Sequence, residues 1–88
     1  MDVIIFILIT YYALGILTSL KYRDFEKVLK IFGYRVLRQK GSHVLFGNSE
    51  GKIIIIPNHK GKTIKEGLAH KIVTKDLKLK PEEFKKLI

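Results

Sequence analysis

The residues best suited to chemistry lie in one short stretch, R-Q-K-G-S-H at 38–43. His43 closes this stretch, directly after Gly41 and Ser42 and at the start of a strand-like run. A glycine permits a tight turn and the close approach of a ligand, and Ser42 adds a hydroxyl group. Three cations surround the turn with positive charge: Arg35, Arg38 and Lys40. The stretch therefore predicts a binding place for a phosphodiester, with an imidazole beside it.

An imidazole in such a place indicates proton transfer, because histidine is the side chain that most readily exchanges a proton near neutral pH. RNA cleavage requires a base for the 2′-hydroxyl and an acid for the departing 5′ oxygen. Neighbouring cations can stabilise the charge that develops on the phosphate without a metal ion. A lone histidine is a weak signal of a site, however. From the residues alone, His43 as an ordinary surface or strand histidine stays open as the alternative.

Two other histidines accompany His43. His59 lies in a basic loop with Lys60 and Lys62, where it suits a loop residue or a phosphate contact better than a second catalyst. His70 falls within a predicted helix and is interpreted as structural or solvent-facing. The histidines lack the spacing of metal ligands, no cysteine joins them, and the acidic residues are scattered. A metal-dependent nuclease is therefore disfavoured, and no cofactor is expected.

The apolar pattern after Lys21 predicts an α+β fold that positions these residues. A first helix ends at Gly33 and has five apolar side chains on one face: Tyr22, Phe25, Val28, Leu29 and Phe32. Strand-like runs follow at 34–39, 42–46 and 52–57, and the short turns between them favour an antiparallel meander. The run Ile53–Ile56 does not alternate with polar residues, so both faces of the third strand are expected to need cover. The helices supply one cover, and a second subunit or the apolar N-terminus is expected to supply the other.

Two helices are expected after the meander. Thr63 and Glu66 have the T-x-x-E spacing of a capping box, which predicts a helix that starts there. Its inward side chains are expected to be Ile64, Leu68, Ile72 and Val73. Pro81 at a first helical position predicts a short last helix, in which the acids come early and the lysines late.

The charge balance favours a polyanionic partner. The 88 residues contain 17 Lys and Arg against 8 Asp and Glu, a formal net charge of +9. All of the cations lie after residue 20. Such a density favours nucleic acid or an anionic membrane surface, with a lysine-rich solvated surface as the alternative. The absence of cysteine fits a reducing cytoplasm, where we expect the protein to reside.

Residues 1–20 form an apolar extension ahead of a basic domain at 21–88. Residues 3–20 carry no charge, and at ~1.5 Å per residue they fall just short of the ~30 Å hydrocarbon core. The extension is interpreted as a misassigned start, an accessory segment packed on the domain, or a weak membrane anchor. The anchor is the least favoured, because polar residues, tyrosines and a glycine interrupt the run. We expect the extension to be dispensable for RNA cleavage.

Residues 21–88 resemble the HicA family of small toxins, which are mRNA interferases. The most specific parts of the resemblance are R-Q-K-G-S-H at 38–43 and P-N-H at 57–59. The resemblance implies a double-stranded-RNA-binding-domain-like fold, with His43 of the G-S-H motif as the active histidine. The chain departs from the family in its extension and in His70, which stands where members usually have an arginine.

The resemblance thus implies a toxin of a toxin–antitoxin pair, a metal-independent endoribonuclease that cleaves mRNA and is held in check by a HicB-like antitoxin. Its site would combine His43 as catalyst with RNA contacts from Arg35, Arg38, Lys40, Gly41, Ser42, His59, Lys60 and Lys62. Two alternatives stay open: a non-catalytic RNA-binding module of the same fold, and a membrane-anchored basic domain. A homo-oligomer through the exposed sheet face is a further expectation.

Overall fold

The computed structural model describes residues 3–5 and 17–88 and shows an α+β fold. In chain order the elements are α2 (Tyr22–Ile31), β1 (Arg35–Lys40), β2 (His43–Gly47), β3 (Ile53–Pro57), α3 (Glu66–Lys71), a π-helical turn η1 (Ile72–Asp76) and α4 (Pro81–Leu87). The predicted order of helix, three-stranded meander, helix and short last helix is confirmed. The observed strand bounds lie within one residue of those expected from the sequence.

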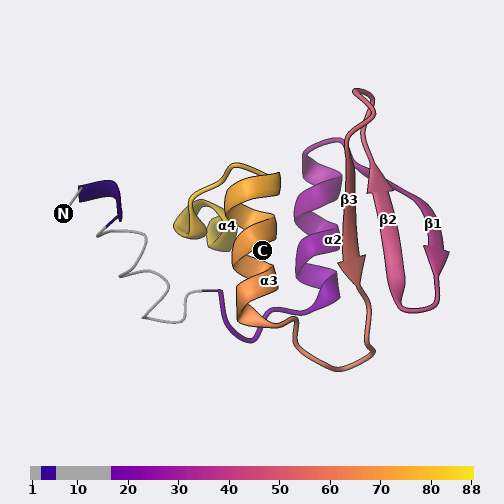
Figure 1. Cartoon of the computed structure of the whole chain (residues 1–88), viewed down its shortest axis with the longest axis horizontal. Helices are drawn as coiled ribbons and strands as arrows, with labels where there is room; N and C mark the ends of the chain where they lie inside the picture. Colours follow the sequence, from indigo (N-terminus) through magenta and orange to yellow (C-terminus); the bar gives the residue numbers. More distant parts are fainter. Residues whose placement is uncertain (1–2, 6–16) are drawn as a thin grey trace.

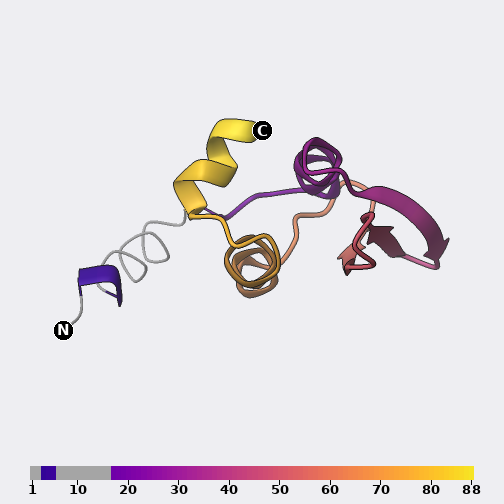
Figure 2. The ribbon, with the colours of Figure 1, turned by 90° about the horizontal axis from the view of Figure 1, so that it is seen from above.

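The sheet occupies one side of the molecule and the helices the other (Figure 1). The strand order is β1-β2-β3, so β1 and β3 form the two edges. Figure 1 shows α2 next to β3, α3 on the other side of α2, and α4 beyond α3. Seen from above, α2 lies over one face of the sheet, and α3 lies past the β3 edge (Figure 2). The β3 edge therefore faces the helical part of the fold, whereas the β1 edge has no neighbouring element among the described residues.

Local signals explain both ends of α2. The backbone amide of Lys21 donates a hydrogen bond of 2.9 Å to the carboxylate of Asp24, which satisfies a free amide at the helix start. At the other end, the Tyr34 amide donates to the Leu29 carbonyl at 2.9 Å and the Gly33 amide to the Lys30 carbonyl at 3.1 Å. This is a Schellman ending, and the φ of +85° at Gly33 is the left-handed conformation that it requires.

The buried face of α2 is narrower than its sequence pattern indicates. Phe25, Val28 and Leu29 are fully buried, as expected. Phe32 is 46% exposed, so its assignment to the buried face was wrong. Phe32 is the C-cap residue of α2, and the chain turns away from the helix at Gly33, directly after it.

Gly33, just past the end of α2, and Gly67, inside α3, provide a matched pair of glycines. We expect Gly33→Ala to lower the free energy of unfolding by about 1 kcal/mol, because a Cβ is disfavoured at a φ of +85°. We expect Gly67→Ala to raise it by about 0.5 kcal/mol, because Gly67 is helical, its φ is not positive, and a Cβ there meets nothing within 4 Å. Urea denaturation of both variants measures the two effects. Equal shifts of the same sign would contradict this account of the Schellman ending.

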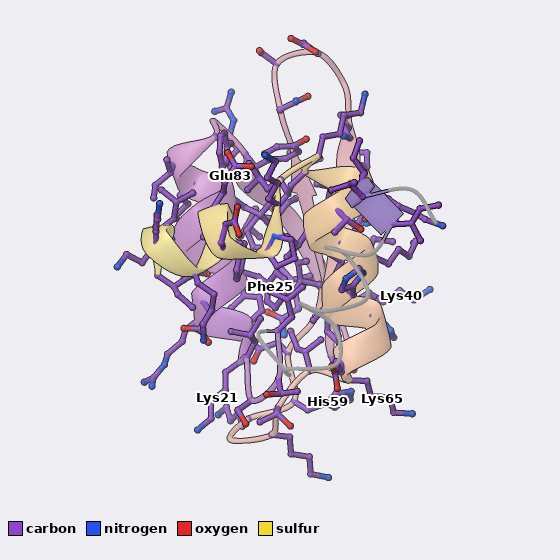
Figure 3. The ribbon with its side chains drawn as sticks, turned by 90° about the vertical axis from the view of Figure 1, so that its left-hand side faces the viewer. Lys21, Phe25, Lys40, His59, Lys65 and Glu83 are labelled. Atoms are coloured by element: carbon purple, nitrogen blue, oxygen red, sulfur yellow. The ribbon has the colours of Figure 1, made fainter. Side chains whose placement is uncertain are left out.

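The sheet buries one face against the helices. Val44 and Phe46 of β2 and Ile54 and Ile56 of β3 are buried and join α2, α3, η1 and α4 in a single hydrophobic cluster. Phe25 lies near the middle of this cluster (Figure 3), and its ring centroid is 5.0 Å from that of Phe84 in α4. The alternation along β2 and β3 decides which side chains point the other way. His43, at the start of β2, is one of these.

The opposite face of the sheet is exposed. Ile53 and Ile55 of β3 are 47% and 49% exposed, and Leu37, at the irregular register of β1, is 55% exposed. Both faces of β3 were expected to be covered. Within the described residues, the helices cover one face, and the face that carries Ile53 and Ile55 is exposed. Whether a second copy covers the other face stays a prediction.

The capping box predicted at Thr63 and Glu66 is wrong. Glu66 is the first residue of α3, and Lys65 before it is extended, with φ −55° and ψ 136°. The Ile64 amide donates a hydrogen bond of 2.7 Å to the carbonyl of Leu20, and the Ile64 side chain is buried in the core. This tertiary attachment holds residues 63–65 outside the helix, so α3 starts later than its local signals indicate.

Leu20 and its neighbour Leu17 belong to the hydrophobic cluster, and each is 2% exposed. Both precede the domain start expected at residue 21, which stays a prediction. Their burial leads us to propose that the folded domain includes residues 17–20, and that only residues 1–16 of the extension are dispensable. Most of the apolar extension, residues 1–2 and 6–16, lies outside the described residues. Within residues 3–5 and 17–88, no helix is long and apolar enough to span a membrane.

Candidate functional site

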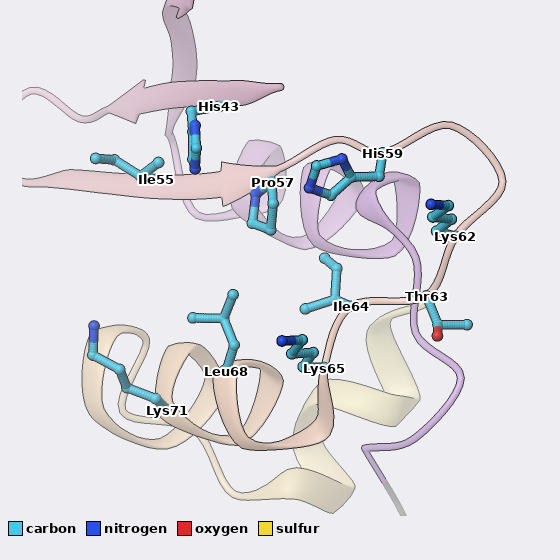
Figure 4. A pocket seen from close by; sticks show the side chains of 10 residues that line it. All are labelled: His43, Ile55, Pro57, His59, Lys62, Thr63, Ile64, Lys65, Leu68 and Lys71. Atoms are coloured by element: carbon cyan, nitrogen blue, oxygen red, sulfur yellow. The ribbon is translucent and has the colours of Figure 1, made fainter. Parts of the chain in front are cut away.

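A cavity of about 540 Å³ lies between β3 and the start of α3 (Figure 4). Its lining combines imidazoles, lysines and apolar side chains, contributed by His43, Ile55, Pro57, His59, Lys62, Thr63, Ile64, Lys65, Leu68 and Lys71. These residues come from β2, from β3, from the loop after β3 and from α3. The cavity therefore exists only because the chain folds α3 against the β3 edge.

The β-hairpin register positions His43 in this cavity. His43 is the first residue of β2, and its Cα pairs with that of Pro57 at the end of β3. The Asn58 amide donates a hydrogen bond of 2.6 Å to the Ser42 carbonyl, which continues the pairing one step past the strands. The G-S-H motif and the P-N-H motif are therefore direct neighbours. His43 is exposed, so its imidazole is accessible to a ligand.

His59 reaches the same cavity from the loop after β3. Its carbonyl accepts a hydrogen bond of 2.9 Å from the Lys62 amide, which closes a tight turn over Gly61, where φ is +73°. Figure 4 shows the His59 ring turned toward Pro57, the residue that pairs with His43. The structure thus brings together two histidines that are well separated in the sequence.

Three lysines give the cavity a positive rim. Lys62 lies in the loop after β3, Lys65 immediately precedes α3, and Lys71 is the last residue of α3. All three are exposed. In the part of the chain that the structure describes, none of them forms an ion pair with a carboxylate. Their charges are therefore available to an anionic ligand.

A second, smaller hollow of about 280 Å³ adjoins the cavity and shares His59 and Lys62 with it. Further residues lining it are Lys21, Tyr22, Arg23, Asn58, Lys60 and Gly61. In the view of Figure 3, Lys21, His59 and Lys65 lie toward the same end of the molecule. The positive surface thus extends from the cavity across the loop to the start of α2.

Tyr22 is the only phenol at the second hollow, and it is unsuited to proton transfer. Burial raises the pKa of the Tyr22 hydroxyl, and the hydrogen bond of 2.8 Å that it donates to the Glu26 carboxylate raises this pKa further. The phenol therefore stays protonated at neutral pH. Among the residues of the two hollows, the imidazoles are the side chains suited to exchange protons.

The other predicted site residues lie outside the cavity. The Cα of Lys40 pairs with that of His43, and the Cα of Arg38 pairs with that of Leu45, which places both cations on the sheet face of His43. Gly41, with φ +58°, and Ser42 form the turn beside them. Arg35 pairs with Gly47 at the far end of β1. The cavity thus joins His43, His59 and Lys62, while the β1 cations extend along the sheet.

Lys65 and Lys71 line the cavity but were not among the site residues predicted from the sequence. Leu68 and Lys71 are three residues apart, and this spacing places them near one face of α3, while Lys65 immediately precedes the helix. The spacing was a usable signal for a shared face. That this face looks toward His43 depends on the packing of α3 beside β3, which no local pattern contains. Separately, no group of three or more His, Asp or Glu side chains within the described ranges is arranged to hold a metal ion.

Comparison with known protein families matches residues 22–79 to the family described as HicA toxin of bacterial toxin–antitoxin. The match covers more than half of the chain. The chain belongs to the HicA toxin family. Within this HicA domain lie all elements from α2 to η1, and both the G-S-H and the P-N-H motif. Searches of curated proteins and of solved structures gave no significant match.

Proposed function

We propose that this HicA chain is an endoribonuclease that cleaves mRNA without a metal ion, with His43 as its proton-transfer residue. The observation that carries the proposal is the shared cavity, which the exposed His43 lines together with His59 and a rim of lysines. Membership of the HicA family supports the same activity. A HicB-type antitoxin is the proposed partner that restrains it.

The proposed reaction uses groups that the cavity supplies. The 2′-hydroxyl of the RNA gives its proton to His43 as the 2′ oxygen forms a bond to phosphorus. The bond from phosphorus to the 5′ oxygen breaks, and this oxygen takes a proton from solvent. Lys62 and Lys65 stabilise the extra negative charge of the phosphorane. The products are a 2′,3′-cyclic phosphate and a free 5′-hydroxyl.

The remaining predicted residues are proposed to hold the RNA. His59 and Lys60 contact phosphates next to the cleaved one, since they lie where the cavity meets the second hollow. Arg38 and Lys40 continue this contact along the sheet face of His43, with Gly41 and Ser42 allowing close approach at the turn. Arg35, at the far end of β1, is proposed to contact only a longer RNA.

The experiment that tests this function compares RNA cleavage by the full chain with cleavage by its His43→Ala variant, in buffer that contains EDTA. Loss of cleavage only in the variant supports the proposal. Binding of RNA by both proteins without cleavage by either would support a non-catalytic RNA-binding module instead.

Salt dependence tests the lysine rim separately. We expect Lys65→Gln to reduce the slope of log affinity against log salt by about 0.7, the value for one contact to a single-stranded phosphate. RNA affinity is measured in a His43→Ala background, so that the RNA stays intact. Lys75→Gln is the control, because Lys75 is an exposed lysine of η1 that lines neither hollow. Equal slopes for the two variants would show that Lys65 is a solvent-exposed lysine that contacts no phosphate of the RNA.

A further inference from the structure

The floor of the cavity is apolar, which phosphate binding does not explain. Leu68 reaches from α3 toward Ile55 and Pro57 of β3, and Ile64 lies below them (Figure 4). Ile55 is 49% exposed and Leu68 is half-buried, so both offer apolar surface to a ligand. A phosphate would not bind to this apolar surface, because the charged group would lose its hydration without gaining a polar partner.

The ligand that fits this cavity has a planar apolar group in its middle and a negatively charged group at each end. The lysines stand at the rim, with Lys62 in the loop after β3 and Lys71 at the end of α3. An unpaired nucleotide in a single strand has this distribution of charge, since its base is a planar group between two phosphates. Proteins that read single-stranded RNA accept splayed bases on aromatic and histidine side chains.

We propose that the cavity binds one unpaired base of a single-stranded RNA, next to the phosphate at which the RNA is cleaved. The base lies on Ile55 and Leu68, and the His43 and His59 rings form its walls. The flanking phosphates meet the lysine rim. This inference rests on the proposed function, because it takes RNA as the substrate, and it adds the place where one base of that RNA binds.

Duplex RNA does not satisfy the same cavity. In a double helix the bases are paired and stacked, so none is free to cover the apolar floor. A duplex would contact only the lysine rim and the β1 cations through its phosphates. The cavity therefore selects against duplex RNA, although lysines alone would bind both forms.

Two isoleucines of β3 make a matched test. Ile55 lines the cavity, whereas Ile53 lies on the same face of the same strand, lines neither hollow, and is almost equally exposed at 47%. We expect Ile55→Ser to raise the KM for a single-stranded oligoribonucleotide about fivefold with little change in kcat, as the loss of one base contact predicts. We expect Ile53→Ser to leave KM and kcat unchanged.

An abasic substrate makes the test specific for a base. With the unmodified protein, removing the base at one position beside the cleaved bond should raise KM by a similar factor. For the Ile55→Ser variant, removing the base should raise KM little further, because the mutation and the missing base remove the same contact. Thermal melting of both variants shows whether the fold is retained.

Several outcomes would overturn the inference. Equal KM values for the two isoleucine variants would do so, as would abasic substrates that are cleaved normally at every position, or duplex RNA cleaved as well as the single strand. If Ile55→Ser affected only binding of an antitoxin, the apolar floor would be a protein contact. If the unmodified chain cleaved no RNA, the proposed function itself would fail, and this is visible before any variant is compared.

Discussion

Replacing His43 with alanine is expected to lower the rate of RNA cleavage by about 10²- to 10⁴-fold, the usual contribution of a general acid or base. The imidazole is exposed at the start of β2 and lines the cavity beside His59. We therefore expect it to contribute proton transfer and little packing. The rate is measured with a fluorescent oligoribonucleotide in the presence of EDTA, and growth inhibition provides a second readout.

The control for His43→Ala is a variant with an equally exposed change far from the cavity. Glu50→Ala suits this purpose, because Glu50 lies in the exposed turn between β2 and β3, at the opposite end of the hairpin. Both variants should keep the melting temperature of the unmodified chain. A folded His43→Ala protein that cleaves at the normal rate would remove His43 from the mechanism. If cleavage required a divalent metal ion, the proposed metal-independent mechanism would be wrong.

Removing residues 1–20 is expected to abolish cooperative folding, whereas removing residues 1–16 is not. Leu17 and Leu20 are each 2% exposed in the core. Deleting a buried leucine side chain costs roughly 2–5 kcal/mol, and a small domain has only about 5–15 kcal/mol of stability in total. Losing both leucines thus removes most of the stability. It also removes the Leu20 carbonyl that accepts the Ile64 amide at 2.7 Å.

The measurement is urea denaturation of chains that begin at residue 17 and at residue 21, each with an added initiator methionine. Leu17→Ala in the full chain tests the same contact without truncation. Its control is Val3→Ala, since Val3 is 69% exposed and its change should have no effect. A chain from residue 21 that melts cooperatively at the same temperature would show that the domain starts after Leu20, as the charge pattern alone indicates.

Much of the fold follows from local signals. The left-handed turn at Gly33, Pro81 at the first position of α4, and the short turn at Gly41 are decided within a few residues of chain. These signals act locally because backbone conformation and nearest hydrogen bonds determine them. The sequence therefore determined the order of the elements, their approximate bounds and the place of His43 at the start of a strand.

Only the tertiary structure decided how these elements meet. The Thr63 and Glu66 pair has the spacing of a cap, yet the Ile64 amide bonds to Leu20 and α3 starts at Glu66. Leu17 is one apolar residue among many in its segment, and its burial depends on contacts with residues far along the chain. Such contacts join segments that lie far apart in the sequence, and a periodic pattern within one segment does not predict them.

The site shows the same division. The G-S-H motif marked His43 as a candidate, and the P-N-H motif marked His59, but their meeting in one cavity required the pairing of β2 with β3. Lys65 and Lys71 line the same cavity because α3 lies past the β3 edge. The sequence by itself determined which groups are available for chemistry. The tertiary structure decided which of them face one ligand, because long-range burial of apolar side chains sets the relative positions of the elements.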